Sequence, residues 1–336
     1  MSRPDPLYSI QFHAVTTDIP RKVSVLDVAM NNIDKIGKLD FKGLSTLQIL
    51  NMSRNQISQV DNGSLGHLEA LQELGLAHNR LTTLPNNLFQ GLVNLPLLHL
   101  DNNLISTIGS SSFQPLSSLK TLNLTKNNLY NMKEVQPIIQ LPHLQEILTS
   151  LKTLLLYDNQ IASLEDGAFE GLVNLTELKL SSNKITQIDI RNTALTGLPR
   201  LRTVDISCNY ITYVNDDTLD PPPLSHLTSL ENLQIHSQRH KGLSRLPINF
   251  LEGLKSLLAF KAGLLNIKNL LPETLIHTPR LCFLDISKNA FTALTSKLFH
   301  PIPRLNRMYL SKARLQSLDF LIGANLGSHF IAGEQE

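Results

Sequence analysis

The short pattern L-x-x-L-x-L-x-x-N-x-L recurs along nearly the whole 336-residue chain. Its first position falls at twelve places, many of them 24 residues apart: Val23, Leu47, Leu71, Leu95, Leu119, Leu151, Leu175, Leu201, Leu230, Leu257, Leu281 and Leu305. Self-similarity at a fixed period indicates a repeat architecture, because one coil cannot bury its own apolar edge and must stack on its neighbours. We therefore predict a stack of coils that grows along one axis.

Each part of the repeat has a physical role. The L-x-L segment alternates, which predicts a short strand with its apolar residues on one side. An Asn at position nine can turn inward and hydrogen-bond the turn of its own coil and the next, whose backbone groups would otherwise be buried unpaired. These residues are Asn31, Asn55, Asn79, Asn103, Asn127, Asn159, Asn183, Asn209 and Asn289. Phenylalanines at position nineteen are expected to fill the convex side: Phe41, Phe89, Phe113, Phe169 and Phe299.

Together these features predict an α/β fold, a leucine-rich-repeat solenoid shaped like a horseshoe. It has a parallel β-sheet on the concave face and an irregular or short-helical convex side. We divide the chain into a lead-in at 1–22 without a cysteine cap, the array at 23–318, and a tail at 319–336. We expect the tail to be frayed or a poor substitute for a cap.

Three places depart from the pattern. At 144–150 the count restarts, as either a bulge or the seam of a lost repeat, and we favour the lost repeat because both flanks match good repeat ends. The repeat from Leu201 is longer and carries prolines at 221–223, which predict a stiff convex loop. In the repeat from Leu230, Gln238 replaces the Asn, and the insert at 237–242 is expected to protrude.

Charge is unevenly distributed. From 239 to 314 there are 13 Lys and Arg against 3 Asp and Glu, whereas the remainder has 17 against 25. A basic end suggests a surface for a polyanion, and the alternative is an ordinary solvated face. The candidate ligand-binding residues are Arg239, His240 and Lys241 of the insert, and Lys261, Lys288, Arg307 and Lys312, which we place on exposed strand surfaces.

These cations could contact phosphates, with affinity that falls steeply with salt. Three histidines, His240, His277 and His300, would add positive charge as the pH falls through about 6.5. Acidification would then strengthen binding. The alternative is that they are ordinary exposed histidines.

Four N-x-S/T sequons are candidate glycosylation sites: Asn51, Asn62, Asn123 and Asn174. Asn51 and Asn123 occupy position five, which faces outward from the concave sheet. Glycans there would block the N-terminal half of the concave surface. Ligand would be directed to a lateral edge or to the C-terminal half, which is also the basic half.

No catalytic or metal-binding motif occurs, so we predict no enzyme, no catalytic residues, no metal site and no cofactor. The two cysteines, Cys208 and Cys282, fall in separate repeats and are predicted to be free thiols in strands. The first residues lack the apolar core of a signal peptide, and no apolar run is long enough for a membrane span.

Several stretches resemble the repeats of Toll-like receptor ectodomains, most of all the fish-type receptors of the nucleic-acid-sensing branch. They are Ile19–Val28, Phe113–Glu146, Val204–Asn209 and Leu284–Asn289, and the resemblance covers 19 to about 318. It implies a pattern-recognition receptor of innate immunity that binds microbial ligand such as RNA. It also implies pairing, as a homodimer or with a receptor partner, to trigger signalling across a membrane.

Such an ectodomain would lie on the extracellular or endosomal-lumen side. This chain departs from the family because it lacks the signal peptide, cysteine caps, transmembrane helix and signalling domain, so we expect an ectodomain fragment. Two alternatives stay open. One is a structural or adhesive leucine-rich-repeat protein that binds other proteins through the concave face. The other is a soluble repeat receptor of the variable-lymphocyte type.

Overall fold

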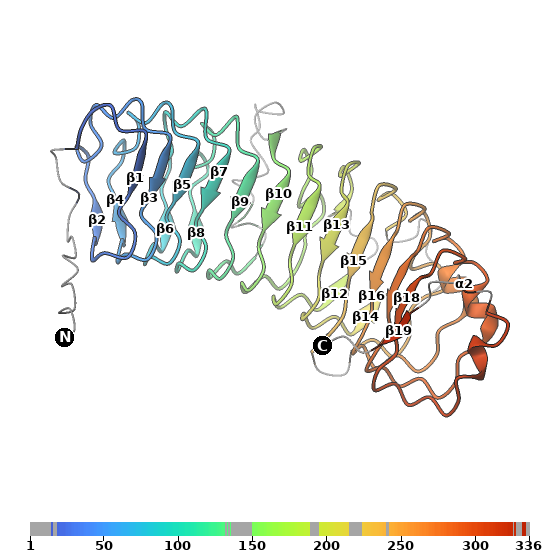
Figure 1. Ribbon diagram of the computed structural model, residues 1–336. Coiled ribbons are helices and arrows are strands. Elements are labelled where there is room, and N and C mark those ends of the chain that lie inside the picture. Colours follow the sequence, from blue (N-terminus) through green and yellow to red (C-terminus); the bar gives the residue numbers. More distant parts are fainter. Residues whose placement is uncertain are drawn as a thin grey trace, which may run out of the picture.

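One strand lies at positions three to five of every predicted repeat. The computed structural model describes residues 15, 19–131, 133, 135, 150–188, 195–214, 224–239, 242–324, 326 and 331–333. Within them, thirteen parallel strands form one sheet in chain order (Figure 1). They are β1 (Val25–Asp27), β3 (Ile49–Asn51), β5 (Glu73–Gly75), β7 (Leu97–His99), β9 (Thr121–Asn123), β10 (Thr153–Leu155), β11 (Glu177–Lys179), β13 (Thr203–Asp205), β15 (Asn232–Gln234), β16 (Ala259–Lys261), β17 (Phe283–Asp285), β18 (Arg307–Tyr309) and β19 (Ile331–Gly333).

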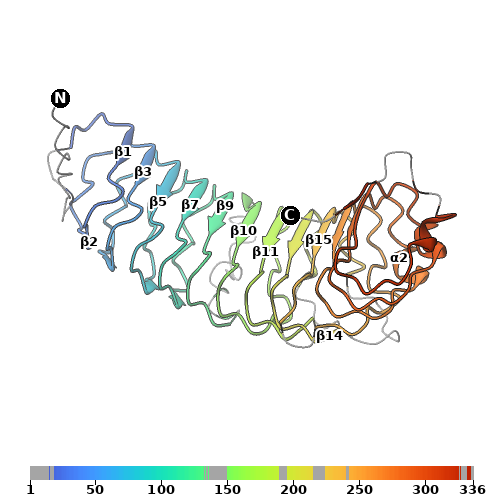
Figure 2. The same cartoon turned by 60° about the horizontal axis from the view of Figure 1, so that its bottom comes forward.

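The coils stack into an open arc with these strands along its inner side (Figure 2). The outer side carries short elements. Parallel pairs of two-residue strands are β2 (Lys35–Ile36) with β4 (Gln59–Val60), β6 (Thr83–Leu84) with β8 (Thr107–Ile108), and β12 (Gln187–Ile188) with β14 (Tyr213–Val214). Short helices are α2 (Pro272–Leu275), η3 (Ser296–Phe299) and η4 (Asp319–Leu321). The predicted fold class is confirmed, and the small convex sheets are an addition to it.

The motif leucines and the convex phenylalanines form one continuous core. Leu50 of β3 and Leu74 of β5 are fully buried, and so are their counterparts in most repeats. All five predicted phenylalanines are at most 1% exposed, and the rings of Phe89 and Phe113 lie 5.6 Å apart in adjacent coils. Burying such a side chain stabilises the fold by about 1.5–3 kcal/mol. Because the contacts are between coils, this stability belongs to the stack and not to a single coil.

A ladder of position-nine amides joins most coils to the one before. In nine repeats the side-chain oxygen accepts the position-eleven N–H of the preceding coil at 2.9–3.1 Å. The side-chain nitrogen donates to the position-six carbonyl of the same preceding coil at 2.8–3.1 Å. It also donates within its own coil, as from Asn127 to the Leu124 carbonyl. The bonds to the coil itself are as predicted, but the partner coil is the preceding one, because the unpaired turn groups face the coil that follows.

Gln238 takes the place of Asn in this ladder without loss. Its oxygen accepts the Ile211 N–H at 3.0 Å, and its nitrogen donates to the Ile206 and Ile235 carbonyls. The next repeat has Leu265 at position nine. Asn289 compensates in part, because its oxygen accepts the N–H groups of both Leu265 and Ile267 at 3.1 Å.

Position eight has a left-handed backbone in all twelve repeats, which the sequence did not predict. Its φ lies between 52° and 59°, although no glycine occupies it: Met30, Arg54, His78, Asn102, Lys126, Asp158, Ser182, Cys208, Ser237, Leu264, Lys288 and Lys312. An L-residue pays roughly 1–2 kcal/mol for this conformation. The turn takes the chain off the concave face and brings the position-nine amide into the core, so the ladder offsets the strain.

The seam and the C-terminal end of the array bear on the boundaries that we predicted. Across the seam, β10 pairs with β9 in the common register, Thr121 opposite Thr153. Residues 144–149 lie outside the described residues, as do the prolines at 221–223, so the choice between bulge and lost repeat stays open. Part of the tail packs on the array: β19 pairs with β18, and Phe320 stacks on Phe299 at 5.6 Å, so the expected fraying does not apply to these residues. The sheet therefore continues beyond 318.

Replacing Asn127 by Ala tests the ladder. The change leaves the Ile105 N–H without its buried partner and removes one of the two side-chain bonds to the Leu100 carbonyl, which keeps the bond from Asn103. One unpaired buried group costs about 1–3 kcal/mol, so the free energy of unfolding should fall by roughly that amount in urea denaturation. The adjacent and exposed Asn128 is the control, and Asn128→Ala should change it by less than about 0.5 kcal/mol. Equal effects of the two substitutions would contradict the ladder.

Candidate ligand-binding surface

Four predicted cations gather over the last three repeats. Lys261 ends β16 and Arg307 begins β18, so both stand on the concave face. Lys288 and Lys312 lie instead at position eight, in the left-handed turns that follow β17 and β18. Their predicted placement on strands was therefore wrong. They extend the basic surface from the sheet onto the edge where the strands end.

A shallow groove brings two of these cations together. Its lining includes Lys261, Lys288 and three serine hydroxyls, and in full it is His236, Ser237, Lys261, Gly263, Leu264, Asp285, Ser287, Lys288 and Ser311. The one carboxylate in this lining, Asp285, is 5% exposed and already bonded, since its Oδ1 accepts from the Ser287 N–H at 2.9 Å and the Ser287 hydroxyl at 2.6 Å. The Ser287 hydroxyl donates to Asp285, and the Ser237 hydroxyl lies 3.0 Å from His236 Nδ1, so the groove offers an anion two cations and the Ser311 hydroxyl.

Two aromatic rings stand beside this groove, and the sequence analysis missed them. Phe283 of β17 and Tyr309 of β18 have ring centroids 5.3 Å apart at an angle of 48°. The Lys261 Nζ lies 5.8 Å from the centre of the Phe283 ring. Their positions in the repeat could have predicted that they face outward, because Phe283 is at position three and Tyr309 is at position five of the next repeat. We call Lys261, Phe283, Lys288, Arg307, Tyr309 and Lys312 the C-terminal concave patch.

Arg239 lies apart from this patch. It follows Gln238 at position ten, where its Nη1 donates to the Tyr210 hydroxyl at 3.1 Å and its guanidinium stands 5.3 Å from the centre of the Tyr210 ring. The hydrogen bond with Tyr210 is the main cause that raises the pKa of Arg239. His240 and Lys241 lie outside the described residues. The basic insert therefore remains a prediction as a ligand contact.

The histidine that faces the patch is His236, not the ones we singled out. Burial lowers the pKa of His236, and Lys261 lowers it further, while Asp205 and Asp285 act in the opposite direction. His277 follows α2 and His300 follows η3, so both lie on the outer side of the arc. Their predicted contribution of charge to the ligand surface was wrong. Burial also lowers the pKa of His226.

These two histidines predict that the fold loses stability on acidification. A pKa that is lower in the folded state means that the unfolded chain binds more protons once the pH drops below the ordinary histidine value of about 6.5. The melting temperature should therefore fall between pH 7.5 and pH 5.5. The variant His236→Asn should show a smaller fall. A melting temperature that rises over this range, or an unchanged slope in the variant, would contradict the prediction.

The four sequons are spread over three surfaces. Asn51 and Asn123 end β3 and β9 on the concave face, where their amides donate to Asp27 at 3.2 Å and Asp101 at 3.0 Å. Asn62 is exposed in the turn after β4. Asn174 lies on the lateral edge at which the strands begin. Two glycan positions therefore face the concave N-terminal half, as we predicted from position five.

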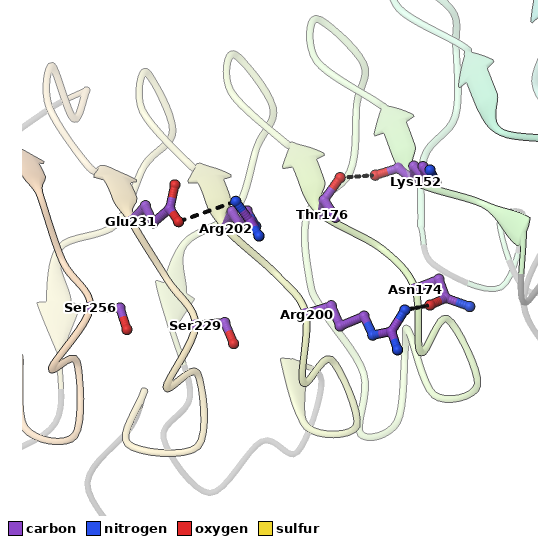
Figure 3. A pocket seen from close by; sticks show the side chains of 8 residues that line it. All are labelled: Lys152, Asn174, Thr176, Arg200, Arg202, Ser229, Glu231 and Ser256. Carbon is purple, nitrogen blue, oxygen red and sulfur yellow. Dashed lines mark hydrogen bonds and ion pairs between the residues drawn. The ribbon is translucent and has the colours of Figure 1, made fainter.

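A second groove follows the edge at which the strands begin (Figure 3). It is lined by residues at position two and just before position one: Lys152, Asn174, Thr176, Arg200, Arg202, Ser229, Glu231 and Ser256. Arg200 donates to Asn174, and Arg202 pairs with Glu231 at 3.4 Å. A similar groove with Lys120 lies along the same edge of earlier repeats. The cations here are partly neutralised within the chain.

Within the residues that the structure describes, no group of three His, Cys, Asp or Glu side chains could hold a metal ion. None of the helices in that part of the chain is long and apolar enough to span a bilayer. Cys208 and Cys282 are free, as predicted. Neither lies in a strand, however, because Cys208 occupies the left-handed turn after β13 and Cys282 directly precedes β17.

Comparisons with known proteins agree with this architecture. A family model described as leucine rich repeat matches residues 21–81, 70–129 and 149–191, and a second, for two copies of the repeat, matches 173–221. Toll-like receptor 9 of Sus scrofa is 31% identical over 143 residues, which cover 42% of this chain and 14% of that protein. Fibromodulin of Oryctolagus cuniculus is 31% identical over 141 residues, covering 42% of this chain and 86% of that protein. The chain thus matches only a small part of the receptor's length.

Among solved structures, the chain is similar to a TLR13–ssRNA13 complex, with a TM-score of 0.76 and 24% identity. The likeness covers 91% of this chain and 46% of the other. An internalin of Listeria monocytogenes also shares the fold, with a TM-score of 0.61, 23% identity and coverage of 92% and 86%. At these identities the likeness establishes the fold alone.

Proposed function

The chain belongs to the leucine-rich-repeat family and resembles Toll-like receptor ectodomains within it, and we propose that it recognises microbial RNA in innate immunity. The observation that carries the proposal is the C-terminal concave patch, where four cations lie on adjacent repeats with a hydroxyl-lined groove between two of them. Phosphodiester oxygens are acceptors that Lys, Arg and hydroxyl groups recognise without a metal. The TLR13–ssRNA13 complex supports the idea by analogy.

The binding residues are those of the patch that carry charge: Lys261, Lys288, Arg307 and Lys312. Arg239, His240 and Lys241 are further candidate contacts at the neighbouring edge. Pairing of the repeat array with a second copy or with another receptor, on the extracellular or endosomal-lumen side of a membrane, would bring cytoplasmic signalling parts together. The likeness to the receptors supports this part of the proposal.

Glycans would restrict ligand to the basic end. Asn51 and Asn123 stand on the concave sheet of the N-terminal half, and a sugar on either would cover the strands around it. Among the described residues, the sequons lie outside the patch. Glycopeptide mass spectrometry of protein secreted from animal cells should find Asn51, Asn62, Asn123 and Asn174 occupied. Unmodified Asn51 and Asn123 would remove this part of the proposal.

Salt titration tests the proposal that the chain binds RNA. Binding of a labelled single strand should weaken linearly in a plot of log affinity against log salt, with a slope near −0.7 per phosphate neutralised. The double variant Lys261→Gln with Lys288→Gln should reduce that slope by about 1.4. Fluorescence anisotropy between roughly 50 and 200 mM salt measures both. Lys255→Gln with Lys297→Gln removes two exposed cations outside the patch and should leave the slope unchanged.

No binding at low salt would reject the RNA clause. The competing function would then be adhesion, with the concave face bound to another protein, and the likeness to fibromodulin favours that alternative. A slope that drops equally in the control variant would reject the assignment of the patch while leaving polyanion binding in place.

A further inference from the structure

We propose that Phe283 and Tyr309 form a stacking platform for an unpaired nucleobase, and that this platform makes the patch select single-stranded over double-stranded RNA. The inference rests on the proposed function. It assigns a role to two rings that the charge argument leaves unused.

The rings belong to the outward face of the sheet. Their strand neighbours Leu284 and Met308 point inward and are fully buried, whereas Phe283 and Tyr309 are half-buried. Apolar rings on this face contribute less to the core than the motif leucines do. The exposed part of each ring is apolar, and because the two ring planes differ by 48°, a flat partner would stack on one ring and contact the other at its edge.

The neighbouring strands leave room for such a partner. In the parallel register Phe283 lies between Ala259 and Arg307, and Tyr309 lies between Asp285 and Gly333. Ala259 has one side-chain carbon and Gly333 has none, so each ring has a small neighbour on one side. The side chain of Asp285 is buried and accepts a hydrogen bond from Ser287, so it does not project over the Tyr309 ring.

Cations flank the rings on both sides. Lys261 lies above Phe283, and the exposed Arg307 stands next to Phe283 in register, at the strand spacing of about 4.8 Å. Lys261 also lines the groove, together with Lys288 and Ser311. A nucleotide whose base stacks on one of the rings would therefore have donors for the phosphates on either side of it.

A duplex cannot use this arrangement. Its bases are already paired and stacked inside the helix, and it presents phosphates and sugars to the protein. Unpaired bases can stack on aromatic side chains, with little preference for sequence because every base has a π-face. The four cations should bind both forms, and the rings should add affinity for the single strand only.

Three ligands of equal length distinguish phosphate binding by the cations from base stacking on the rings. They are a single-stranded RNA, the same sequence as a duplex, and a strand of abasic nucleotides. Anisotropy at one fixed salt concentration should show that the full chain binds the single strand most tightly. The double variant Phe283→Leu with Tyr309→Leu should lose roughly 5- to 150-fold of single-strand affinity, the loss expected for stacking of one base. Its affinity for the duplex and the abasic strand should change by less than about twofold.

Matched variants keep the result interpretable. Tyr157→Leu removes a half-buried tyrosine from position seven of an earlier repeat and should have no effect. Tyr309→Phe keeps the ring and should restore most of the affinity lost by Tyr309→Leu. Arg307→Gln should weaken all three ligands alike. The melting temperature of each variant shows that it is folded.

The inference is overturned if the abasic strand binds as tightly as the RNA, or if the leucine variant keeps its preference for the single strand. In either case salt-dependent binding would still support the proposed function. If none of the three ligands binds at low salt, the proposed function fails, and the platform fails with it.

Discussion

The structure depends on one recurring interaction: in nine coils the position-nine amide bonds the polar turn groups of the coil before it. Without that bond, the position-eleven N–H would be buried without a partner, and the position-six carbonyl would keep only the side-chain bond from its own coil. The bond fixes the register of these coils on their neighbours, from Asn55 onto the coil of Val28 to Asn289 onto the coil of Ala262, whereas Leu265 interrupts the ladder. The left-handed turn at position eight is what brings the amide inward, at a cost that the ladder offsets.

Register in turn determines where recognition can occur. Because the motif leucines are committed to the core, positions three, five, seven and eight are the residues that vary freely on the inner face. Twelve coils in phase turn these positions into continuous rows. The C-terminal concave patch is such a set of rows, with Lys261 and Tyr309 at position five, Phe283 and Arg307 at position three, and Lys288 at position eight. Its chemistry is independent of what holds the fold together.

Much of the fold could be predicted, because Leu, Asn and Phe recur at fixed spacings. Each of these residue types has the same role in every repeat in which it occurs: core packing, hydrogen bonds between coils, and filling of the convex side. Strand β10 follows the same register even after an irregular stretch. The site was harder, because it depends on contacts between neighbouring repeats. The sequence placed Lys288 and Lys312 on strands, because the left-handed backbone at position eight was not predicted. The contact between Phe283 and Tyr309 forms across two strands, and Arg239 bonds Tyr210 of the preceding repeat, so neither contact could be recognised within a single repeat. The strand at Ile331–Gly333 carries no leucine motif, so the repeat pattern did not predict it.

Native-state hydrogen exchange of the position-eleven amides tests the central claim most directly. The N–H groups of Ile57, Ile105 and Ile185 are bonded only to side chains of the following coil. The account predicts that they exchange as slowly as the amides of the central strands, because both open only when neighbouring coils separate. Exchange at the rate of exposed turns would show that the amide ladder does not join the coils, and would contradict the account.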